Sequence, residues 1–296
     1  MPTSLSRTVA TAVVALACAL ASVCGQAPPA PKAIPAPGPR VVSLVPAATE
    51  MLFAVGAGPQ VIGVSSFDER PAEVKTLPKL GALLDPDLER ILALKPDLVV
   101  TYGSQEALDQ QLAQAGIQTL TFRHGGIGDT LATLEELATR TGHAEQGRMT
   151  ANVMRAKLNA VRMRVEGRPR PRALLVFGRE PGTVRQVWVS GGTGFLHDLL
   201  DVAGADNVFA DADRENVQAT TEVLLGRAPD VIIELRRETS AAGDAEALRA
   251  WQVLGSIPAV RDGRVLRLAG DDFVIPGPRL VDAAERLARA LHPDAF

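Results

Sequence analysis

LERILALKPDLVV at residues 88–100 is repeated in pattern as TEVLLGRAPDVII at residues 221–233. In each copy a short amphipathic segment ends at a proline, which interrupts a helix, and Asp followed by an apolar, β-branched run predicts a buried strand. The spacing from Glu to Pro to Asp is the same in both copies. The repeat therefore predicts two similar lobes, with Glu89 and Glu222 in equivalent positions.

Strand and helix patterns alternate on both sides of this repeat, which is typical of a parallel sheet covered by helices. In the N-terminal lobe, residues 40–142, we expect strands at 41–44, 61–65, 98–102 and 118–122 and helices at 51–57, 88–94, 106–115 and 128–141. In the C-terminal lobe, residues 169–296, we expect strands at 173–177, 231–234 and 265–268, a hairpin at 186–189 and helices at 195–202, 245–254 and 278–291.

Residues 143–168 separate the two lobes and have no strand pattern. They predict one long helix of about 35 Å, with Val153, Leu158, Val161 and Val165 at helical spacings. The predicted fold class is therefore α/β, with two Rossmann-like lobes joined by a single long helix. Such a helix permits only small lobe motions, and a ligand is expected in the cleft at the carboxyl ends of the strands.

The N-terminus has the pattern of an export signal. Residues 1–24 combine Arg7 with an apolar run and small residues, which predicts a signal peptide. Cys24 is a candidate lipidation site, and cleavage after Ala21 without lipidation is the alternative. Residues 25–39 are rich in proline and predict an extended tether. We expect a protein of the periplasm or of the outer face of the cytoplasmic membrane.

Composition excludes several functions. The 296 residues carry a formal charge of −3 and 46% hydrophobic residues, which fits a globular protein with real cores. No basic stripe suggests nucleic-acid binding. The two cysteines lie at positions 18 and 24, so the exported part has no disulfide framework, and the four histidines have no metal-ligand spacing. We therefore expect no structural metal and no required cofactor.

Several segments resemble periplasmic binding proteins of cobalamin, haem and ferric-siderophore ABC importers. They are RVVSLVPAATEMLFAVGAG at 40–58, the stretch at 88–100, the stretch at 191–211, and GPRL at 277–280 with LHP at 291–293. The resemblance extends from about residue 40 to residue 292 and fits the cobalamin branch best. It implies the helical-backbone solute-binding fold and a monomer that captures a corrinoid and delivers it to an ABC permease with its ATPase.

The resemblance also implies site residues. Glu89 and Glu222 match the surface glutamates that dock to permease arginines. The expected ligand-binding residues are Phe67, Leu83, Tyr102, Phe177, Arg179, Trp188, Asn216, Asp271, Asp272 and Phe273. Aromatic walls with a few polar anchors suit a large planar ligand. Tyr102 is a metal ligand only if the ligand is haem, and Arg279 is expected to brace the loop at residues 271–273.

Other functions remain as alternatives. Haem or a ferric siderophore is the second candidate ligand. A nucleotide-dependent enzyme on Rossmann-like lobes is a remote alternative, because GGIG at 125–128 and GGTG at 191–194 lack the remaining residues of phosphate-binding motifs. No Gly-x-Ser-x-Gly elbow occurs, so we expect no catalytic residues. An adhesin or a sensor with the same fold is a third reading.

Overall fold

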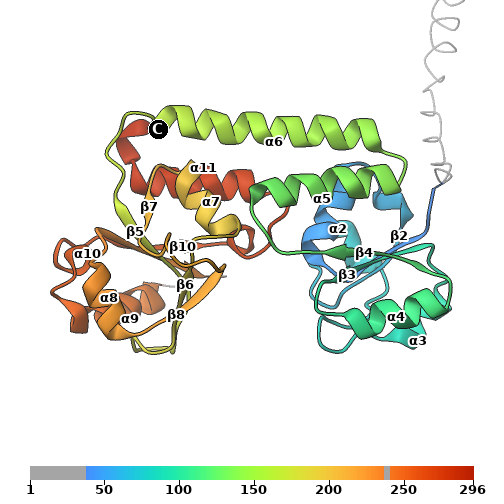
Figure 1. The fold of residues 1–296 in the computed structure, drawn as a ribbon, viewed down its shortest axis with the longest axis horizontal. Helices are drawn as coiled ribbons and strands as arrows, with labels where there is room; N and C mark the ends of the chain where they lie inside the picture. The colour runs from blue at the N-terminus through green and yellow to red at the C-terminus, as the bar shows by residue number, and fades with distance from the viewer. Residues whose placement is uncertain (1–37, 237–240) are drawn as a thin grey trace, which may run out of the picture. The chain divides into compact units, whose positions relative to one another are not determined.

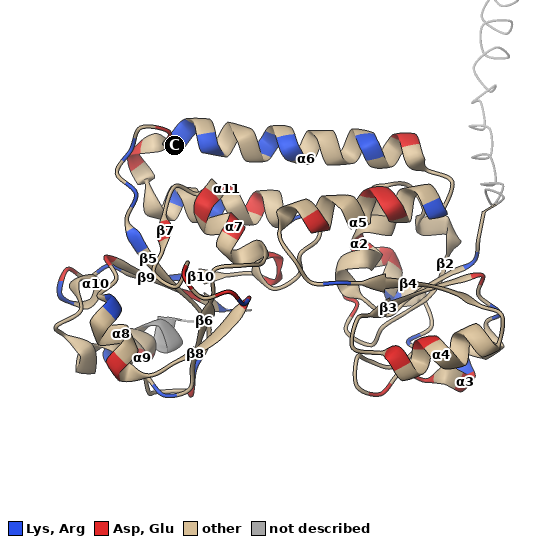
Figure 2. Cartoon of the chain, in the orientation of Figure 1, with Lys and Arg blue, Asp and Glu red and all other residues tan. Residues whose placement is uncertain are grey.

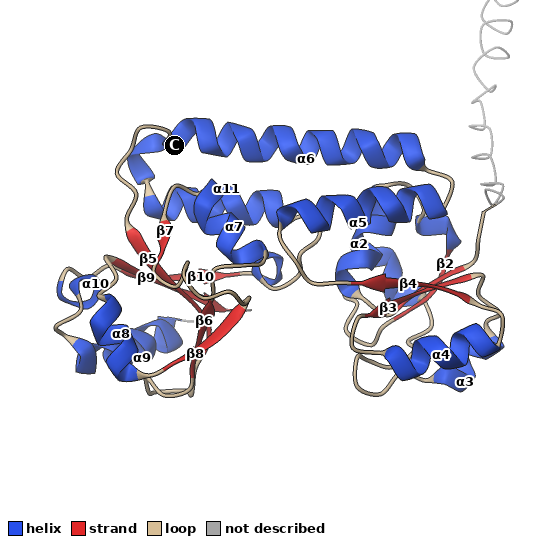
Figure 3. Cartoon of the chain, viewed as in Figure 1, coloured by secondary structure: helices blue, strands red, loops and turns tan. Residues whose placement is uncertain are grey.

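The computed structural model describes residues 38–236 and 241–296. The predicted signal peptide, Cys24 and nearly all of the predicted tether lie outside the described residues. The described chain has two sheets, each with helices on both faces, joined along one side by long helices (Figures 1 and 3).

The N-terminal lobe contains a parallel sheet of strand order β2-β1-β3-β4. The strands are β1 Val41–Ser43, β2 Val61–Val64, β3 Leu98–Tyr102 and β4 Gln118–Phe122. Side chains alternate across this sheet, as the period of two requires. Val41 and Val100 pack in the core that includes α2 Pro46–Ala54 and α5 Ile127–Arg140, whereas Val42 and Val99 pack with α3 Leu88–Ala93 and α4 Glu106–Gln114.

The C-terminal lobe has a mixed sheet of strand order β10-β9-β5-β6-β8, in which β7 also pairs with β5. Strands β5, β9 and β10 are parallel, whereas β6 and β8 are antiparallel. The strands are β5 Arg172–Gly178, β6 Val187–Ser190, β7 Asp206–Asn207, β8 Asn216–Ala219, β9 Val231–Arg236 and β10 Val265–Ala269.

The helices of this lobe are α7 Phe195–Val202, α8 Thr221–Arg227, α9 Ala241–Trp251, α10 Pro258–Arg261 and α11 Leu280–Leu291. The sequence did not predict β8 or α10. The predicted helix at 245–254 also differs, since α9 ends at Trp251 and a 3-10 turn at Gln252–Leu254 follows it. The predicted final helix begins two residues later than expected, at Leu280.

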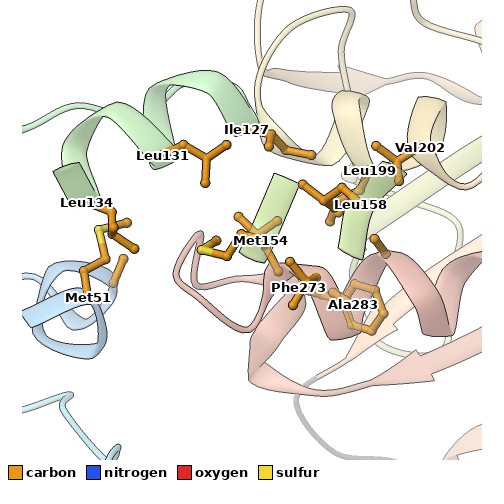
Figure 4. Close-up of a cluster of buried hydrophobic side chains, with 14 of the residues drawn as sticks. Met51, Ile127, Leu131, Leu134, Met154, Leu158, Leu199, Val202, Phe273 and Ala283 are labelled. Atoms are coloured by element: carbon orange, nitrogen blue, oxygen red, sulfur yellow. The ribbon is translucent and has the colours of Figure 1, made fainter. Parts of the chain in front are cut away.

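Helix α6, Ala144–Val165, is the long helix that joins the lobes and packs against α5, α7 and α11. It belongs to one apolar core that continues from the N-terminal lobe into the C-terminal lobe, as Met51, Met154, Leu158 and Leu199 show (Figure 4). Lys and Arg residues recur along the helix (Figure 2). Of the four residues whose spacing predicted this helix, Val153 is 56% exposed, and its neighbour Met154 is buried. The predicted fold class is confirmed.

The repeated sequence forms the same unit in both lobes. A residue with left-handed backbone follows each of helices α3 and α8, Lys95 with φ 49° and Ala228 with φ 43°. The proline and aspartate follow, and each aspartate accepts a hydrogen bond from a backbone N–H just before or at the start of the neighbouring strand. Asp97 accepts from Arg40 at 2.7 Å, and Asp230 accepts from Arg172 at 3.0 Å. This hydrogen bond explains why an aspartate directly precedes both β3 and β9.

Candidate ligand-binding site

A cavity of about 250 Å³ lies at the carboxyl edge of the N-terminal sheet. Each strand of that sheet contributes lining residues, which lie at its carboxyl end or in the segment that follows it. Across the cavity, a segment after β10 supplies the wall from the C-terminal lobe. The lining residues are Leu44, Val45, Pro46, Ala47, Ser65, Phe67, Leu83, Tyr102, Phe122, His124, Val274, Ile275 and Pro276. Most of them are apolar or aromatic.

Three rings form one wall of this cavity. The rings of Tyr102 and His124 are stacked, with centroids 5.9 Å apart, and Phe122 meets both edge-on at 6.2 and 5.5 Å. Such offset and edge-on contacts are favourable beyond the area that they bury. Burial raises the pKa of the Tyr102 phenol, and the Asp68 carboxylate raises it further. The hydroxyl therefore keeps its proton at neutral pH.

The loop after β2 places Phe67 at the cavity, where its ring is 61% exposed. Asp68 anchors this loop through hydrogen bonds of its side chain and its backbone. Its Oδ2 accepts a hydrogen bond from Ser65 N at 2.9 Å, and Lys79 Nζ donates to its carbonyl oxygen at 2.7 Å. The Asp68 side chain is buried, and burial raises its pKa to about 6 despite hydrogen bonds from Thr49 and Ser65. Phe67 thus stands on a loop with a buried polar anchor.

The cavity adjoins two neighbours whose linings include charged side chains. One of about 290 Å³ shares Pro46, Phe67 and Ile275 with the first cavity and reaches Asp271. Another of about 720 Å³ shares Glu50, Glu69 and Arg70 with the second. The shared residues make the three cavities parts of one cleft, with an apolar end and a charged end.

Ion pairs cross the charged end from one lobe to the other. Arg279 binds Glu50 of α2 through two hydrogen bonds of 2.6 and 2.9 Å and also binds Asp271 at 2.6 Å. Asp271 in turn accepts from Arg70 Nε at 3.2 Å. The Glu50 hydrogen bonds are the main reason that the pKa of Arg279 is raised. Arg279 braces the loop as expected, and it also ties the C-terminal lobe to α2.

The structure brings some of the predicted site residues together and separates others. Phe67, Leu83 and Tyr102 line the first cavity, and Asp271 lines the second. Phe273 does not, because its side chain is 0% exposed and packs in the core under the Arg286 guanidinium. Asp272 is also buried and accepts hydrogen bonds from Arg286 Nη1 at 2.8 and 3.0 Å. The expectation that these two side chains line the cleft is therefore corrected.

The other predicted residues of the C-terminal lobe lie outside these three cavities. Phe177 is partly buried and packs against the main core. Trp188 on β6 and Asn216 on β8 belong to the antiparallel part of the sheet, where Trp188 is 40% exposed. The strand register pairs Trp188 with Gly178 and with Gln218, so Phe177, Trp188 and Asn216 lie on three neighbouring strands.

Arg179 was expected to anchor the ligand, but it lies in a buried charge cluster. Its Nε donates to Glu234 Oε1 at 2.5 Å, and the two side chains are 3% and 0% exposed. Trp251 Nε1 donates to the same oxygen at 2.7 Å, and Arg236 binds the other oxygen at 3.2 Å. Burial opposes ionisation of Glu234, but the hydrogen bonds from Arg179 and Trp251 outweigh it and lower its pKa. Arg179 braces the strand ends in this arrangement.

Sequence reasoning missed several lining residues. His124 had a signal, since it comes two residues after the predicted strand at 118–122. Phe122 ends that strand, which is the position expected of a cleft residue. Val274, Ile275 and Pro276 form a short apolar run after two aspartates, and nothing in the run itself predicts that it faces the opposite lobe.

The predicted docking residues are on the surface. Glu89 on α3 and Glu222 on α8 are both exposed, and both helices lie on the side of residues 38–296 that faces away from α6 (Figure 1). The backbone N–H of Glu222 and the Thr220 hydroxyl lower the pKa of the Glu222 carboxyl group. Each lobe thus presents one carboxylate from an equivalent helix.

Two further properties concern the described residues as a whole. Within 38–236 and 241–296, no group of three or more His, Cys, Asp or Glu side chains is arranged to hold a metal ion. No helix in the same part of the chain has the length and apolar character that crossing a membrane requires.

Comparisons with known proteins give a consistent result. Residues 41–271 match the family model described as periplasmic binding protein. The chain is 33% identical over 256 residues to the vitamin B12-binding protein of Salmonella typhimurium, covering 86% of this chain and 90% of the relative.

Solved structures of the same architecture bind more than one kind of ligand. The periplasmic vitamin B12-binding protein of Vibrio cholerae superposes with a TM-score of 0.73 at 25% identity and covers 88% of this chain and 98% of its own. A periplasmic haem-binding protein from Pseudomonas aeruginosa also gives 0.73 at 25% identity and covers 88% of this chain and 94% of its own.

Proposed function

The chain belongs to the periplasmic binding protein family, and we propose that it captures a corrinoid in the cleft between its lobes and delivers it to an ABC permease. One observation carries the choice of ligand. The cleft joins an apolar, ring-lined cavity to a rim in which Arg70 and Arg279 are already paired with carboxylates. A corrinoid matches this arrangement because it combines a large macrocycle with neutral amide side groups. The relatives that bind vitamin B12 support the same choice.

The size of the cleft supports a large ligand. A cavity of about 250 Å³ is smaller than most sites for drug-sized molecules. A macrocycle seated there must therefore extend into the adjoining cavities of about 290 and 720 Å³. Its side groups then lie beside Glu50, Arg70 and Asp271, where amides have both donors and acceptors to bind.

The charged rim favours a corrinoid over haem. Arg70 and Arg279 are both paired with carboxylates, so neutral amides, which need no unpaired charge, fit beside them better than the carboxylates of haem do. Haem remains the second candidate, because haem-binding proteins share the fold and the Tyr102–His124 stack lines the cavity.

A titration of the purified exported part with cyanocobalamin, cobinamide, haem and iron-loaded siderophores tests the ligand. We expect saturable binding of both corrinoids at a stoichiometry of one, followed by intrinsic fluorescence and absorbance. A shift of the haem Soret band that is lost in Tyr102→Phe, with no corrinoid binding, would replace the corrinoid with haem. Binding of none of the four would reject the proposed ligand class.

Glu89 and Glu222 are proposed to guide delivery. Contacts between carboxylates and arginines are charge-assisted and directional, so one on each lobe orients the protein over a two-fold permease. Glu89→Lys/Glu222→Lys is expected to abolish corrinoid uptake in cells while the purified variant binds ligand as the wild type does. Glu106→Lys/Glu145→Lys, which reverses two exposed acids elsewhere, is the matched control. Normal uptake by the first variant would refute the docking role.

A further inference from the structure

Each helix that carries a docking glutamate also exposes a leucine one turn later. Leu92 on α3 is 37% exposed, and Leu225 on α8 is 40% exposed. Residues three apart on a helix are neighbours on the same surface, so each leucine lies beside its glutamate. We call Glu89 with Leu92 the N-lobe patch and Glu222 with Leu225 the C-lobe patch.

The two patches are built on equivalent scaffolds. Between each glutamate and leucine, one residue is 0% exposed and fixes the helix to its lobe, Ile91 in α3 and Leu224 in α8. Both helix starts are capped by a side chain: Asp87 accepts from Arg90 N at 3.0 Å, and Thr220 accepts from Val223 N at 3.4 Å. The carboxylate and the leucine are therefore presented from a fixed backbone in both lobes.

The glutamates alone have a simpler explanation, but the leucines do not share it. A carboxylate in the first helical turn is stabilised by the N–H groups there, as the lowered pKa of Glu222 shows. An exposed leucine gains nothing from that position, and its apolar surface stays in contact with water. One exposed leucine is ordinary on a protein surface, whereas the same leucine beside the same acid in both lobes indicates a shared contact.

Resting on the proposed delivery function, we propose that each patch makes a two-part contact with the permease. The glutamate pairs with a cationic side chain, and the leucine packs on apolar surface next to that cation. An ion pair that stays exposed to water stabilises binding by only about 0–1 kcal/mol, and neighbours that exclude water strengthen such contacts. In each patch the leucine would exclude water from the ion pair of the neighbouring glutamate.

The two patches differ in one neighbour. Val223 in the C-lobe patch region is 41% exposed, and the equivalent residue in the N-terminal lobe is Arg90, which pairs with Asp87 at 3.9 Å. The apolar part of the contact is therefore larger on the C-terminal lobe. Removing Leu225 is expected to weaken docking more than removing Leu92.

Leu92→Ser, Leu225→Ser and the double variant test the proposal. Each replaces the only copy of the chain in cells of the source bacterium, and uptake of labelled cyanocobalamin is measured. We expect uptake to fall severalfold in each single variant, more for Leu225→Ser, and at least tenfold in the double variant. Val153→Ser/Met163→Ser, which removes two exposed apolar side chains of α6, is the control and is expected to leave uptake unchanged.

Cyanocobalamin titration of each purified variant separates this proposal from the one on which it rests. If the wild-type chain neither binds cyanocobalamin nor restores uptake, the proposed function fails. If the wild type does both and the double leucine variant matches the control, the two-part contact is overturned. A photo-crosslinking amino acid at position 92 or 225 gives a second measurement: we expect a crosslink to an integral membrane protein, and its absence at both positions would also overturn the contact.

Discussion

Arg40 and Arg172 make the same hydrogen bonds to the ends of two different helices. Arg40 donates to the carbonyl oxygens of Leu94 and Lys95 at 2.8 and 3.2 Å, and Arg172 donates to those of the equivalent residues Arg227 and Ala228 at 2.7 and 3.1 Å. Carbonyl groups at a helix end lack intrahelical donors, and cationic side chains satisfy them well. The repeated unit is thus a repeated set of contacts as well as a repeated pattern.

The left-handed residue of this unit predicts the sign of two substitutions. Ala228, with φ 43°, adopts a conformation that costs less for glycine than for other residues. Ala228→Gly is expected to raise the free energy of unfolding by about 0.5–1 kcal/mol in urea denaturation. Ala228→Val should lower it, because a β-branched side chain disfavours positive φ. Equal stability of the two variants would contradict this account.

The buried carboxylate of Glu234 is expected to be essential for the C-terminal lobe. Glu234→Gln leaves Arg179 buried without its charged partner, and breaking such a pair typically lowers the free energy of unfolding by about 3–5 kcal/mol. Urea denaturation followed by fluorescence measures the change. Asp262→Asn removes an exposed ion pair with Arg261 and serves as the control, for which we expect no measurable change. A similar small effect of both substitutions would show that the cluster contributes little.

Asp68 predicts a pH-dependent stability difference. Burial raises its pKa in the folded protein from 3.8 to about 6, so the folded state binds this proton more tightly than the unfolded state. The resulting stabilisation is complete below pH 3.8 and is lost as the pH rises through about 6. Asp68→Asn lacks this titration. Relative to the wild type, it should therefore gain roughly 2 kcal/mol between pH 4 and pH 7.

Urea denaturation of both proteins at each pH measures this difference. The contributions of the other titrating groups cancel, because these groups are the same in both proteins. Glu69→Gln, at an exposed neighbouring acid, is the control and should follow the wild type. A difference between Asp68→Asn and the wild type that does not change with pH would show that the carboxyl group titrates as it does in water.

The fold was predictable because its main elements depend on local patterns. Strands β3 and β4 and helix α7 begin and end where their apolar periodicity predicted. Strand β8, with the sequence NVQA, is short and half polar, and pairing with β6 rather than its own composition makes it a strand.

The site was only partly predictable, because neighbouring residues in a loop point in different directions. Asp271 faces the cleft, but the 3-10 turn at Asp271–Phe273 directs the next two side chains into the protein. Arg179 ends a strand at the cleft edge, as predicted, yet a buried glutamate from the adjacent strand binds it. Local sequence identifies such positions, whereas their direction depends on partners distant in the chain.

Phe67 is expected to contribute to ligand affinity and little to stability. Its ring is 61% exposed in the free protein, so Phe67→Ala removes little packing and should change the free energy of unfolding by less than about 0.5 kcal/mol. A macrocycle in the cavity would cover the ring, and losing that contact should cost about 1–2 kcal/mol, or about five- to thirtyfold in the Kd for cyanocobalamin. Leu84→Ala is the matched control, because Leu84 is 94% exposed and is absent from the cavity lining. Isothermal titration of the three proteins decides the matter: equal Kd values for both variants would mean that the ligand does not rest on Phe67.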